Sequence, residues 1–511
     1  MDMELPYYSY HLGLCILLAV LYHAVLNVAV AVAAAARRPR PKLPPGPWQL
    51  PIIGSLHHLL RGLPHHIMRD LSLRHGPLML LRVCEREAIV VSSAEAAREI
   101  YKGNEAAFST RLSSPGIDEL SRHGQGIVFA PYGDHWRLLR RILVMELLSA
   151  RRVEAFRRIR EEEAARLLSS LQAEATSDVD IGERLEEFVT DSVVRAMFGD
   201  RLPDRATFLR IVKQGVDLSS IFDFRDLFPS SWLVRLVRRR GGKAERQRQE
   251  VFSVMDSILK SHEERRAARD GDDEQEQDMV QVLLRIQKDA SSPVSLTDGV
   301  IRTLLIEVFG AALDTTATTL QWAMAELMAN PRVMRGVQSE VDCALAGQAT
   351  VQEVALKSMQ YLRAVIKETL RLHPPATLLA RVCVGDCKIQ GYDVTRGMIV
   401  LTNTWAISRD PSYWDEPDKF MPERFEGEGV ADLRGMDFEF TPFGVGRRIC
   451  PGIDFAYANI EIALASLLYH FHWELPLGVE PGEVDMREEF GVTARRKVKL
   501  FVRPIIRVPL R

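Results

Sequence analysis

Apolar residues are concentrated in long runs with helical spacing, and the first long run stands near the N-terminus. No charged residue occurs between Glu4 and Arg37. As a helix, the mostly apolar residues from Leu12 to Ala36 would measure about 37 Å, which exceeds the roughly 30 Å core of a bilayer. The pattern therefore predicts a transmembrane anchor over residues 1–36.

A cleaved signal peptide and a buried core helix are the alternatives to an anchor. Ala33–Ala36 resemble a cleavage site, but a signal peptide begins with basic residues and has a shorter apolar stretch. Here Asp2 and Glu4 precede the run, and a basic cluster over residues 37–42 follows it. Basic residues mark the cytosolic side of a membrane helix. We therefore expect an uncleaved single-pass anchor with the remainder of the chain in the cytosol.

The stretch after the anchor predicts a stiff connection. Residues 43–47 are Leu-Pro-Pro-Gly-Pro, and consecutive prolines favour an extended backbone over a helix. We expect a basic, proline-rich hinge over residues 37–47 and a globular body over residues 48–511.

Helical patterns dominate this body. Residues 150–290 are rich in helix formers, and other helices are predicted over residues 95–102, from Gly299 onward and over residues 361–372. Short strand-like segments occur within residues 76–92 and at 387–389, 392–394 and 399–403. The pattern thus indicates a mainly helical body with a few short strands.

The apolar helix that starts at Gly299 carries polar residues at Asp314 and Thr315. Polar groups inside an apolar helix are costly unless they are satisfied. Threonine hydroxyls can bond back to a carbonyl one turn earlier and bend the helix, so a bent core helix is one interpretation. The other is an acid–alcohol pair that passes protons to a reacting oxygen.

Near the C-terminus, Cys450 stands in a loop that is rich in glycine and proline. Gly444, Gly446 and Gly452 allow sharp bends. A helical pattern begins just after the cysteine, and the positive end of that helix, together with Arg447 and Arg448, favours a thiolate. The loop therefore indicates a site that holds a sulfur anion.

A thiolate on a loop can be a nucleophile, a zinc ligand or a heme ligand. A zinc site needs partners at short spacing, and the nearest cysteines, Cys383 and Cys387, lie far upstream. A nucleophile needs a base, and no histidine falls between Phe440 and Gly452. An inert, buried cysteine remains the structural alternative.

Composition narrows the class of protein. The net charge of −2 argues against a nucleic-acid binder. Six scattered cysteines are too few for a disulfide scaffold and fit a reducing compartment. With 47% hydrophobic residues, the chain has ample material for a large core.

Residues 443–452 fit the pattern Phe-x-x-Gly-x-Arg-x-Cys-x-Gly. This pattern resembles the heme-binding loop of the cytochrome P-450 family of heme-thiolate monooxygenases, and the resemblance extends from the anchor to Thr493. The hinge and the cysteine loop resemble the large plant endoplasmic-reticulum group of specialised metabolism. The implied fold is mainly α with small β-sheets: a single cytochrome P-450-type heme-thiolate domain, preceded by an N-terminal transmembrane helix.

The resemblance implies a role for each of several residues. Heme b would be bound by Trp136, Arg140, Ala311, Arg381, Phe443, Arg448, Cys450 and Gly452, with Cys450 as the axial iron ligand. Asp314 and Thr315 would be catalytic, as a proton relay. Glu368, Arg371 and Arg424 would form a structural network. Leu313, Thr377, Leu378, Leu379 and Val492 would line the substrate pocket, and residues 108–130 would cover it. Ala312 departs from the family pattern, which usually has glycine there.

The expected function is that of an NADPH- and O2-dependent monooxygenase acting on a lipophilic small molecule, such as a terpenoid or a phenolic. The sequence shows no convincing flavin or nicotinamide fingerprint, so electrons would come from an NADPH-cytochrome reductase, with cytochrome b5 as a further partner. We expect no nucleic-acid partner and a place on the endoplasmic-reticulum membrane, with the catalytic domain facing the cytosol.

Two other functions remain open. One is a heme-thiolate isomerase or dehydratase that rearranges a peroxide without O2 or a reductase, and the other is a non-catalytic heme-binding protein. Asp314 and Thr315 favour the monooxygenase, because a rearrangement needs no proton relay. Ala312 alone favours the rearrangement.

Overall fold

The computed structural model describes residues 41–113, 118, 121, 125–200, 202, 205–220, 224–231, 242–267, 278–289, 296–427 and 431–510. The predicted anchor over residues 1–36 and the first part of the predicted hinge lie outside these residues. Within the described part of the chain, no helix has both the length and the apolar character needed to cross a membrane.

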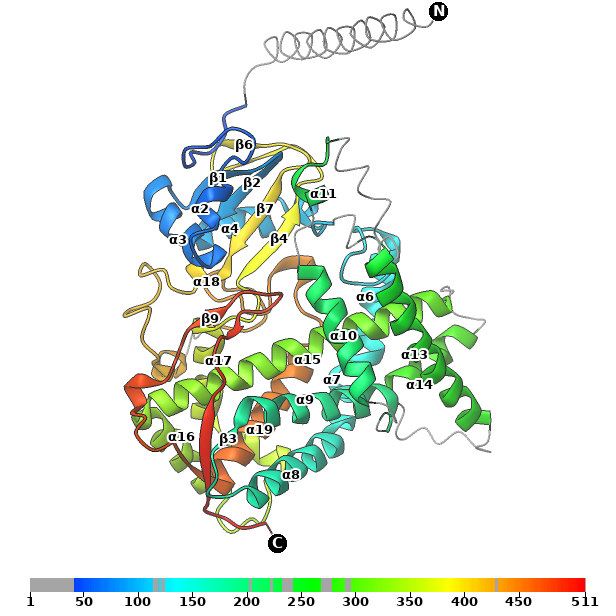
Figure 1. The fold of residues 1–511 in the computed structure, drawn as a ribbon, viewed down its shortest axis with the longest axis vertical. Helices are drawn as coiled ribbons and strands as arrows, with labels where there is room; N and C mark the ends of the chain where they lie inside the picture. The colour runs from blue at the N-terminus through cyan, green and yellow to red at the C-terminus, as the bar shows by residue number, and fades with distance from the viewer. Residues whose placement is uncertain are drawn as a thin grey trace, which may run out of the picture.

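Helices make up most of the structure (Figure 1). Those before the central helix are α2 (Leu56–Leu59), α3 (Pro64–His75), α4 (Ala94–Arg98), α6 (Asp134–Ile142), α7 (Ala150–Ala155), α8 (Arg157–Ala173), α9 (Ile181–Phe198), α10 (Arg205–Ser220), α11 (Phe224–Leu227), α13 (Gly242–Ala267) and α14 (Met279–Lys288). The central helix and those after it are α15 (Asp298–Ala329), α16 (Pro331–Ala344), α17 (Gln360–Leu372), α18 (Thr404–Ile407) and α19 (Ile453–His470).

Helix α15 crosses the middle of the helical body (Figure 1). Its start is capped by Thr297, whose side chain accepts a hydrogen bond from the Val300 amide at 3.3 Å. Its end coincides with Asn330, and Pro331 then opens α16. Because α15 is largely apolar around its circumference, it is buried among α9, α17 and α19.

A four-stranded sheet stands beside the helical body, toward the N-terminal end (Figure 1). Its order is β1 (Leu78–Val83), β2 (Arg86–Val91), β7 (Ile399–Asn403), β4 (Leu378–Val382). The β1–β2 and β4–β7 pairs are antiparallel, and β2 pairs with β7 in parallel, with Ala88 opposite Ile399. Strand β4 carries three of the predicted site residues: Leu378, Leu379 and Arg381.

Three smaller sheets complete the fold. Strands β3 (Val179–Asp180), β11 (Phe501–Ile506) and β8 (Phe471–Glu474) form one, β5 (Cys387–Ile389) pairs with β6 (Tyr392–Val394), and β9 (Glu488–Glu489) pairs with β10 (Arg495–Arg496). The predicted mainly helical fold with small sheets is confirmed, as are the strands within residues 76–92 and the helix over residues 361–372. The predicted helix over residues 95–102 is α4 followed by a π-helical turn, Glu99–Gly103.

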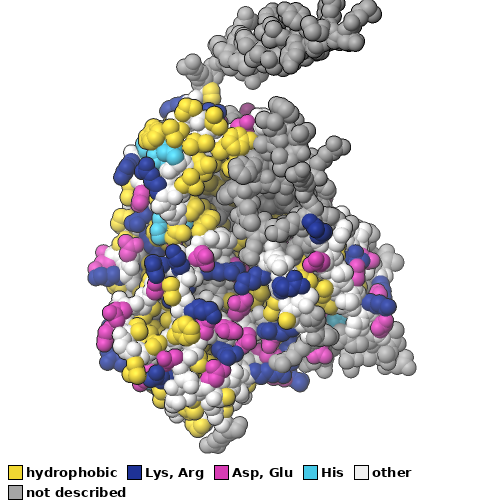
Figure 2. Space-filling view, viewed as in Figure 1, with side chains coloured by type: hydrophobic (Ala, Val, Ile, Leu, Met, Phe, Trp, Pro, Cys, Tyr) yellow, Lys and Arg dark blue, Asp and Glu magenta, His cyan; other side chains and the backbone are white. Residues whose placement is uncertain are grey.

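The surface is not uniform. Figure 2 shows mixed charges over the helical body and hydrophobic side chains gathered over the N-terminal end of the same face. Large apolar side chains of that end are well exposed, including Trp48, Ile52 and Leu60. The four-stranded sheet and its helices thus carry the most apolar part of this face.

Candidate active site

The Cys450 loop has the sharp bends that its glycines predicted. Gly444 and Gly446 have φ values of 76° and 65°, a left-handed region that favours glycine. The Cys450 amide donates to the Phe443 carbonyl at 2.9 Å and closes the loop. The Gly452 amide donates to the Cys450 sulfur at 3.4 Å. The loop therefore presents the sulfur just before α19 begins.

Burial of the sulfur opposes the predicted preference of this loop for the anion. Burial raises the pKa of the Cys450 thiol, while the Gly452 amide, Arg140 and Arg111 oppose that effect. Arg447 was expected to add positive charge near the sulfur, but its side chain forms an ion pair with Glu105 at 2.9 Å. A bound metal ion deprotonates a coordinating thiol outright, so the thiolate would come from metal binding rather than from the loop.

Buried or half-buried arginine residues gather near Cys450 from four parts of the chain. Arg140 lies on α6, Arg381 on β4 and Arg448 in a 3-10 turn, Gly446–Arg448, while Arg111 follows the π-helical region. Burial lowers the pKa of Arg111 to about 9 and that of Arg448 to about 10, and repulsion from Arg381 adds to both shifts. The site therefore concentrates positive charge in a poorly hydrated place.

This arrangement fits a cofactor that carries carboxylates. The Arg111 Nε is buried without a hydrogen-bond partner among the described residues. Arg448 uses its guanidinium on backbone carbonyls of Ser109, Val128 and Ala130 instead of a carboxylate. Buried cations are stabilised only when an anion or a full set of acceptors is present. The two carboxylates of heme would supply such anions next to the one cysteine of the cluster.

The other predicted cofactor residues lie on the same elements. Trp136 is buried on α6, one turn before Arg140, and its ring lies 4.9 Å from the Arg448 guanidinium carbon. Phe443 packs against the core at the start of the cysteine loop. Ala311 is exposed on α15 although its neighbour Gly310 is buried. The helix runs through Ala312 without interruption.

Asp314 and Thr315 direct their hydrogen bonds to different partners. The Thr315 hydroxyl donates to the Ala311 carbonyl at 2.8 Å, which is the self-satisfied arrangement considered above. The Asp314 carboxylate accepts from the Thr493 hydroxyl at 2.6 Å and forms an ion pair with Arg495. In the structure the acid is therefore tied to the C-terminal segment.

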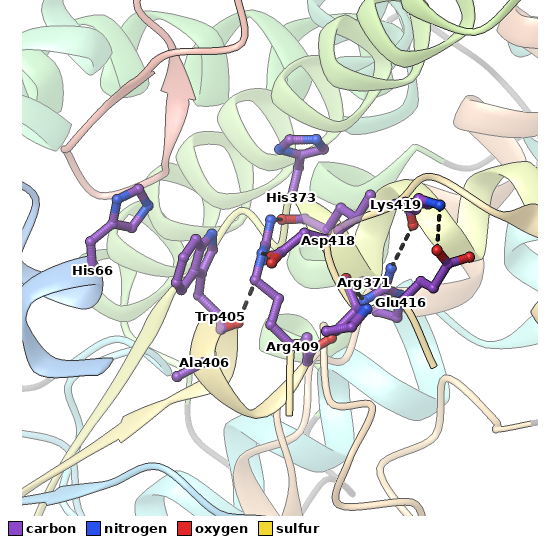
Figure 3. Close-up of polar contacts among 12 residues, drawn as sticks. His66, Arg371, His373, Trp405, Ala406, Arg409, Glu416, Asp418 and Lys419 are labelled. Atoms are coloured by element: carbon purple, nitrogen blue, oxygen red, sulfur yellow. Dashed lines mark hydrogen bonds and ion pairs between the residues drawn. The ribbon is translucent and has the colours of Figure 1, made fainter. Parts of the chain in front are cut away.

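The structure brings Glu368, Arg371 and Arg424 into one network. Arg371 donates to both Glu368 oxygens, at 2.7 and 2.9 Å, and Arg424 donates to Glu368 at 3.0 Å. Both Glu368 and Arg371 are fully buried. Arg371 also donates to the Lys419 carbonyl, and Figure 3 shows this contact beside Trp405 and Arg409 on the neighbouring segment. The network joins α17 to the segment that leads toward the cysteine loop.

The predicted substrate-pocket residues are dispersed. Leu313 lines a cavity of about 130 Å³ between α9, α10 and α15. Leu378 and Leu379 are half-buried on β4, with Thr377 buried just before it, and Val492 is 48% exposed. Of the five residues, only Leu313 is among those that line this cavity.

Glu307 is a site residue to which the sequence analysis assigned no role. One of its oxygens accepts from the Val128 amide at 2.9 Å, and the other is buried without a partner among the described residues. Burial raises its pKa to about 7, against the effects of the Val128 and Ile127 amides and of Arg111. Gly126 lies so close that an added Cβ would be 2.1 Å from the carboxylate. The sequence feature that could have identified Glu307 is an acidic residue inside an apolar helix.

A second unassigned cluster holds the C-terminal segment. One oxygen of Glu488 accepts from His65 at 2.7 Å and from His66 at 3.0 Å, and the other accepts from the Trp405 ring at 3.3 Å. These two histidines and Glu488 could offer three ligand atoms to a metal ion. Their separations are those of hydrogen bonds, so in this structure the cluster fastens β9 to α3.

Comparisons with known proteins support the resemblance. The family model described as cytochrome P450 matches residues 44–501. The chain is 43% identical to desmethyl-deoxy-podophyllotoxin synthase of Sinopodophyllum hexandrum, over 94% of this chain and 95% of that one. It is 41% identical to zealexin A1 synthase of Zea mays, over 96% and 98%. A zebra fish cytochrome P450 structure with abiraterone has a TM-score of 0.73 at 25% identity and covers 87% of this chain and 99% of its own.

Proposed function

Because this chain belongs to the cytochrome P450 family and is a heme-thiolate monooxygenase, we propose that it uses NADPH and O2 to hydroxylate, or otherwise oxidise, a lipophilic plant metabolite of the terpenoid or phenolic class. Curated relatives from plants include proteins named dolabradiene monooxygenase and premnaspirodiene oxygenase. The observation that carries the proposal is the group of buried arginines around Cys450.

The proposal gives each part of the site a task. Heme, when bound, supplies the activation of dioxygen, which an electron-donating thiolate ligand favours. Cys450 would be that ligand, with the Gly452 amide beside its sulfur. Arg140, Arg381 and Arg448 would neutralise the heme carboxylates. Trp136, Ala311 and Phe443 would form the remaining walls of the cofactor site.

Asp314 and Thr315 would handle protons. Thr315 lies one turn after Ala311 on α15, and its hydroxyl would turn from the Ala311 carbonyl to an oxygen substrate at the same face. Asp314 would take up a proton and pass it to the Thr315 hydroxyl. The apolar Leu313, Leu378 and Leu379, with Thr377 and Val492, would contact the substrate.

Electrons and location follow from the same proposal. An NADPH-cytochrome reductase would deliver electrons, with cytochrome b5 as an additional donor. Residues 1–36 would anchor the chain in the endoplasmic-reticulum membrane, and the catalytic domain over residues 48–511 would face the cytosol. The apolar surface near Trp48, Ile52 and Leu60 is suited to lie against a lipid surface.

The test uses the full-length protein in membranes with a reductase, NADPH, isotopically labelled dioxygen and a pool of terpenoid and phenolic precursors. We expect one precursor to gain one labelled oxygen atom by mass spectrometry, and only when NADPH is present. A product that forms without NADPH and carries no label would contradict the proposal and favour rearrangement of a peroxide.

A further inference from the structure

Asp314 is held in a closed ring of three side chains. Its Oδ2 accepts from the Thr493 hydroxyl at 2.6 Å, and its other oxygen pairs with the Arg495 guanidinium. Arg495 Nε in turn donates to the Thr493 hydroxyl at 3.4 Å. Thr493 is buried and Asp314 is largely so. An ion pair that is partly buried and reinforced by a hydroxyl fixes the carboxylate more firmly than an exposed pair does.

One side of this ring faces the cavity between α9, α10 and α15, which lie next to one another in Figure 1. Its polar lining consists of Glu186, Arg210, Lys213, Asp314, Thr318, Gln321 and Arg495. A cavity of about 130 Å³ with several polar groups has room and hydrogen-bond partners for several water molecules. Asp314 therefore has a source of protons on this side.

Helix geometry places Thr315 on the other side. Consecutive residues of an α-helix point about 100° apart. Gly310, Asp314 and Gln321 line the cavity at helical spacing, whereas Ala311 and Thr315 follow one another on the adjoining face. Asp314 thus lies on the cavity face of α15, next in sequence to Thr315 on the adjoining face.

We propose that Thr493 and Arg495 are positioning residues that hold the Asp314 carboxylate at this cavity, where it collects protons from cavity water for Thr315. The inference rests on the proposed role of Asp314 in proton relay. A hydronium ion of the cavity gives its proton to the carboxylate and becomes water. The carboxyl group would pass that proton to the Thr315 hydroxyl, which would give up its own proton to an oxygen substrate beside it, and the carboxylate would be restored.

The proposal also connects substrate and proton supply. Thr493 directly follows Val492, which we propose to contact the substrate, and β10 starts with Arg495. The Ala494 amide between them donates to the Pro375 carbonyl at 2.9 Å, and its carbonyl accepts from the Trp322 ring at 2.9 Å. A substrate that shifts this segment will therefore shift the groups that hold Asp314.

The test measures coupling in the full-length enzyme with reductase, NADPH and an accepted substrate. The readouts are the fraction of NADPH electrons that appears as hydrogen peroxide and the kinetic solvent isotope effect in D2O. For Arg495→Gln and Thr493→Val we expect the peroxide fraction to rise about threefold or more and the isotope effect to increase. Arg495→Lys and Thr493→Ser should restore most of the coupling. Lys497→Gln, which removes a charge from an exposed residue two positions on, should match the unchanged enzyme.

Asp314→Asn distinguishes the relay role of Asp314 from the positioning roles of Thr493 and Arg495. If this variant keeps normal coupling, the proposed relay role of Asp314 fails. If it uncouples the enzyme while Arg495→Gln and Thr493→Val stay coupled with an unchanged isotope effect, the relay stands and the positioning inference is overturned. Combining Arg495→Gln with Asp314→Asn should add nothing to Asp314→Asn alone, because both act through one carboxylate. Additive effects would also overturn the inference.

Discussion

At the residue scale, the chemistry of the candidate site depends on charges that the chain leaves uncompensated. Cys450 has a raised pKa in its buried loop, while buried arginines near it have lowered pKa values. Each shift has burial as its first cause. Without a cofactor, burial disfavours the thiolate and the charged guanidinium groups. A cofactor that brings iron and two carboxylates would favour both charged forms.

Cys450→Ala tests the ligand assignment. We expect loss of essentially all turnover and loss of the carbon monoxide difference spectrum that a thiolate-ligated heme gives in the reduced protein. The matched control is Cys343→Ala, since Cys343 is exposed on α16. A Cys450→Ala protein that turns over normally would refute the assignment.

The raised pKa of Glu307 predicts that the contribution of this residue to the stability of the protein falls as pH rises. The pKa of Glu307 in the folded protein, about 7, lies above the ordinary value of 4.5. Protonated Glu307 therefore stabilises the folded state fully below pH 4.5, and this stabilisation is lost as pH rises through 7. For Glu307→Gln, which keeps an acceptor for Val128, the free energy of unfolding relative to the unchanged protein should rise with pH. The rise should be up to about 3 kcal/mol between roughly pH 5 and pH 8.

The measurement is thermal or denaturant unfolding of both proteins across that range. Glu474→Gln, at an exposed strand position, is the control and should give a difference that does not vary with pH. A flat difference for Glu307→Gln would mean that Glu307 is not a buried, high-pKa carboxyl group.

At the scale of elements, the buried network joins helix α17 to the 3-10 turn Pro422–Phe425. Glu368 is the only carboxylate among its three members, and it accepts from both Arg371 and Arg424. The same Glu368 also accepts from the Met421 amide at 2.8 Å, which fixes the start of the turn. Removing the Glu368 carboxylate would leave the buried Arg371 guanidinium without its anionic partner. It would also remove the hydrogen bond that fixes the start of the turn.

Glu368→Ala should therefore destabilise the protein by about 3–5 kcal/mol, the usual cost of breaking a buried ion pair from one side. Chemical unfolding monitored by circular dichroism measures this loss. Glu426→Ala, at an exposed position just after the turn, should change stability by less than about 0.5 kcal/mol. A similar small change for Glu368→Ala would show that the network contributes little to the fold.

At the scale of the whole molecule, the four-stranded sheet and its exposed apolar side chains lie at the N-terminal end of the described chain (Figures 1 and 2). The helical body, with mixed charges, lies farther from that end. The exposed apolar side chains at the sheet end would favour the membrane attachment that we propose.

Deletion of residues 1–36 tests the anchor as a separate unit. We expect the shortened protein to leave the membrane fraction on centrifugation while it keeps the carbon monoxide difference spectrum, because we propose that residues 1–36 only anchor the chain and that the heme-binding residues, from Trp136 to Gly452, belong to the catalytic domain. A shortened protein that stays in the membrane fraction would show that the exposed apolar end is sufficient for attachment.

Much of this protein could be predicted from patterns along the chain. Helical spacing predicted α15 and α17, short apolar segments predicted strands within residues 76–92, and glycine spacing predicted the bends around Cys450. These features are local. Periodicity and the backbone freedom of glycine act over a few residues, so the local sequence is sufficient to predict the helices, the strands and the bends.

Only the tertiary structure decided which groups face one another. Arg111 was not a predicted site residue, yet folding places it near Cys450, and Asp314 pairs with Arg495 although 181 positions separate them in the chain. Burial, which sets the pKa of Glu307 and of Cys450, is likewise a property of the packed molecule. Sequence alone predicted a cysteine ligand and determined the helical framework. The balance of desolvation against charge arose only when distant segments packed together, because both effects depend on distances that no local pattern specifies.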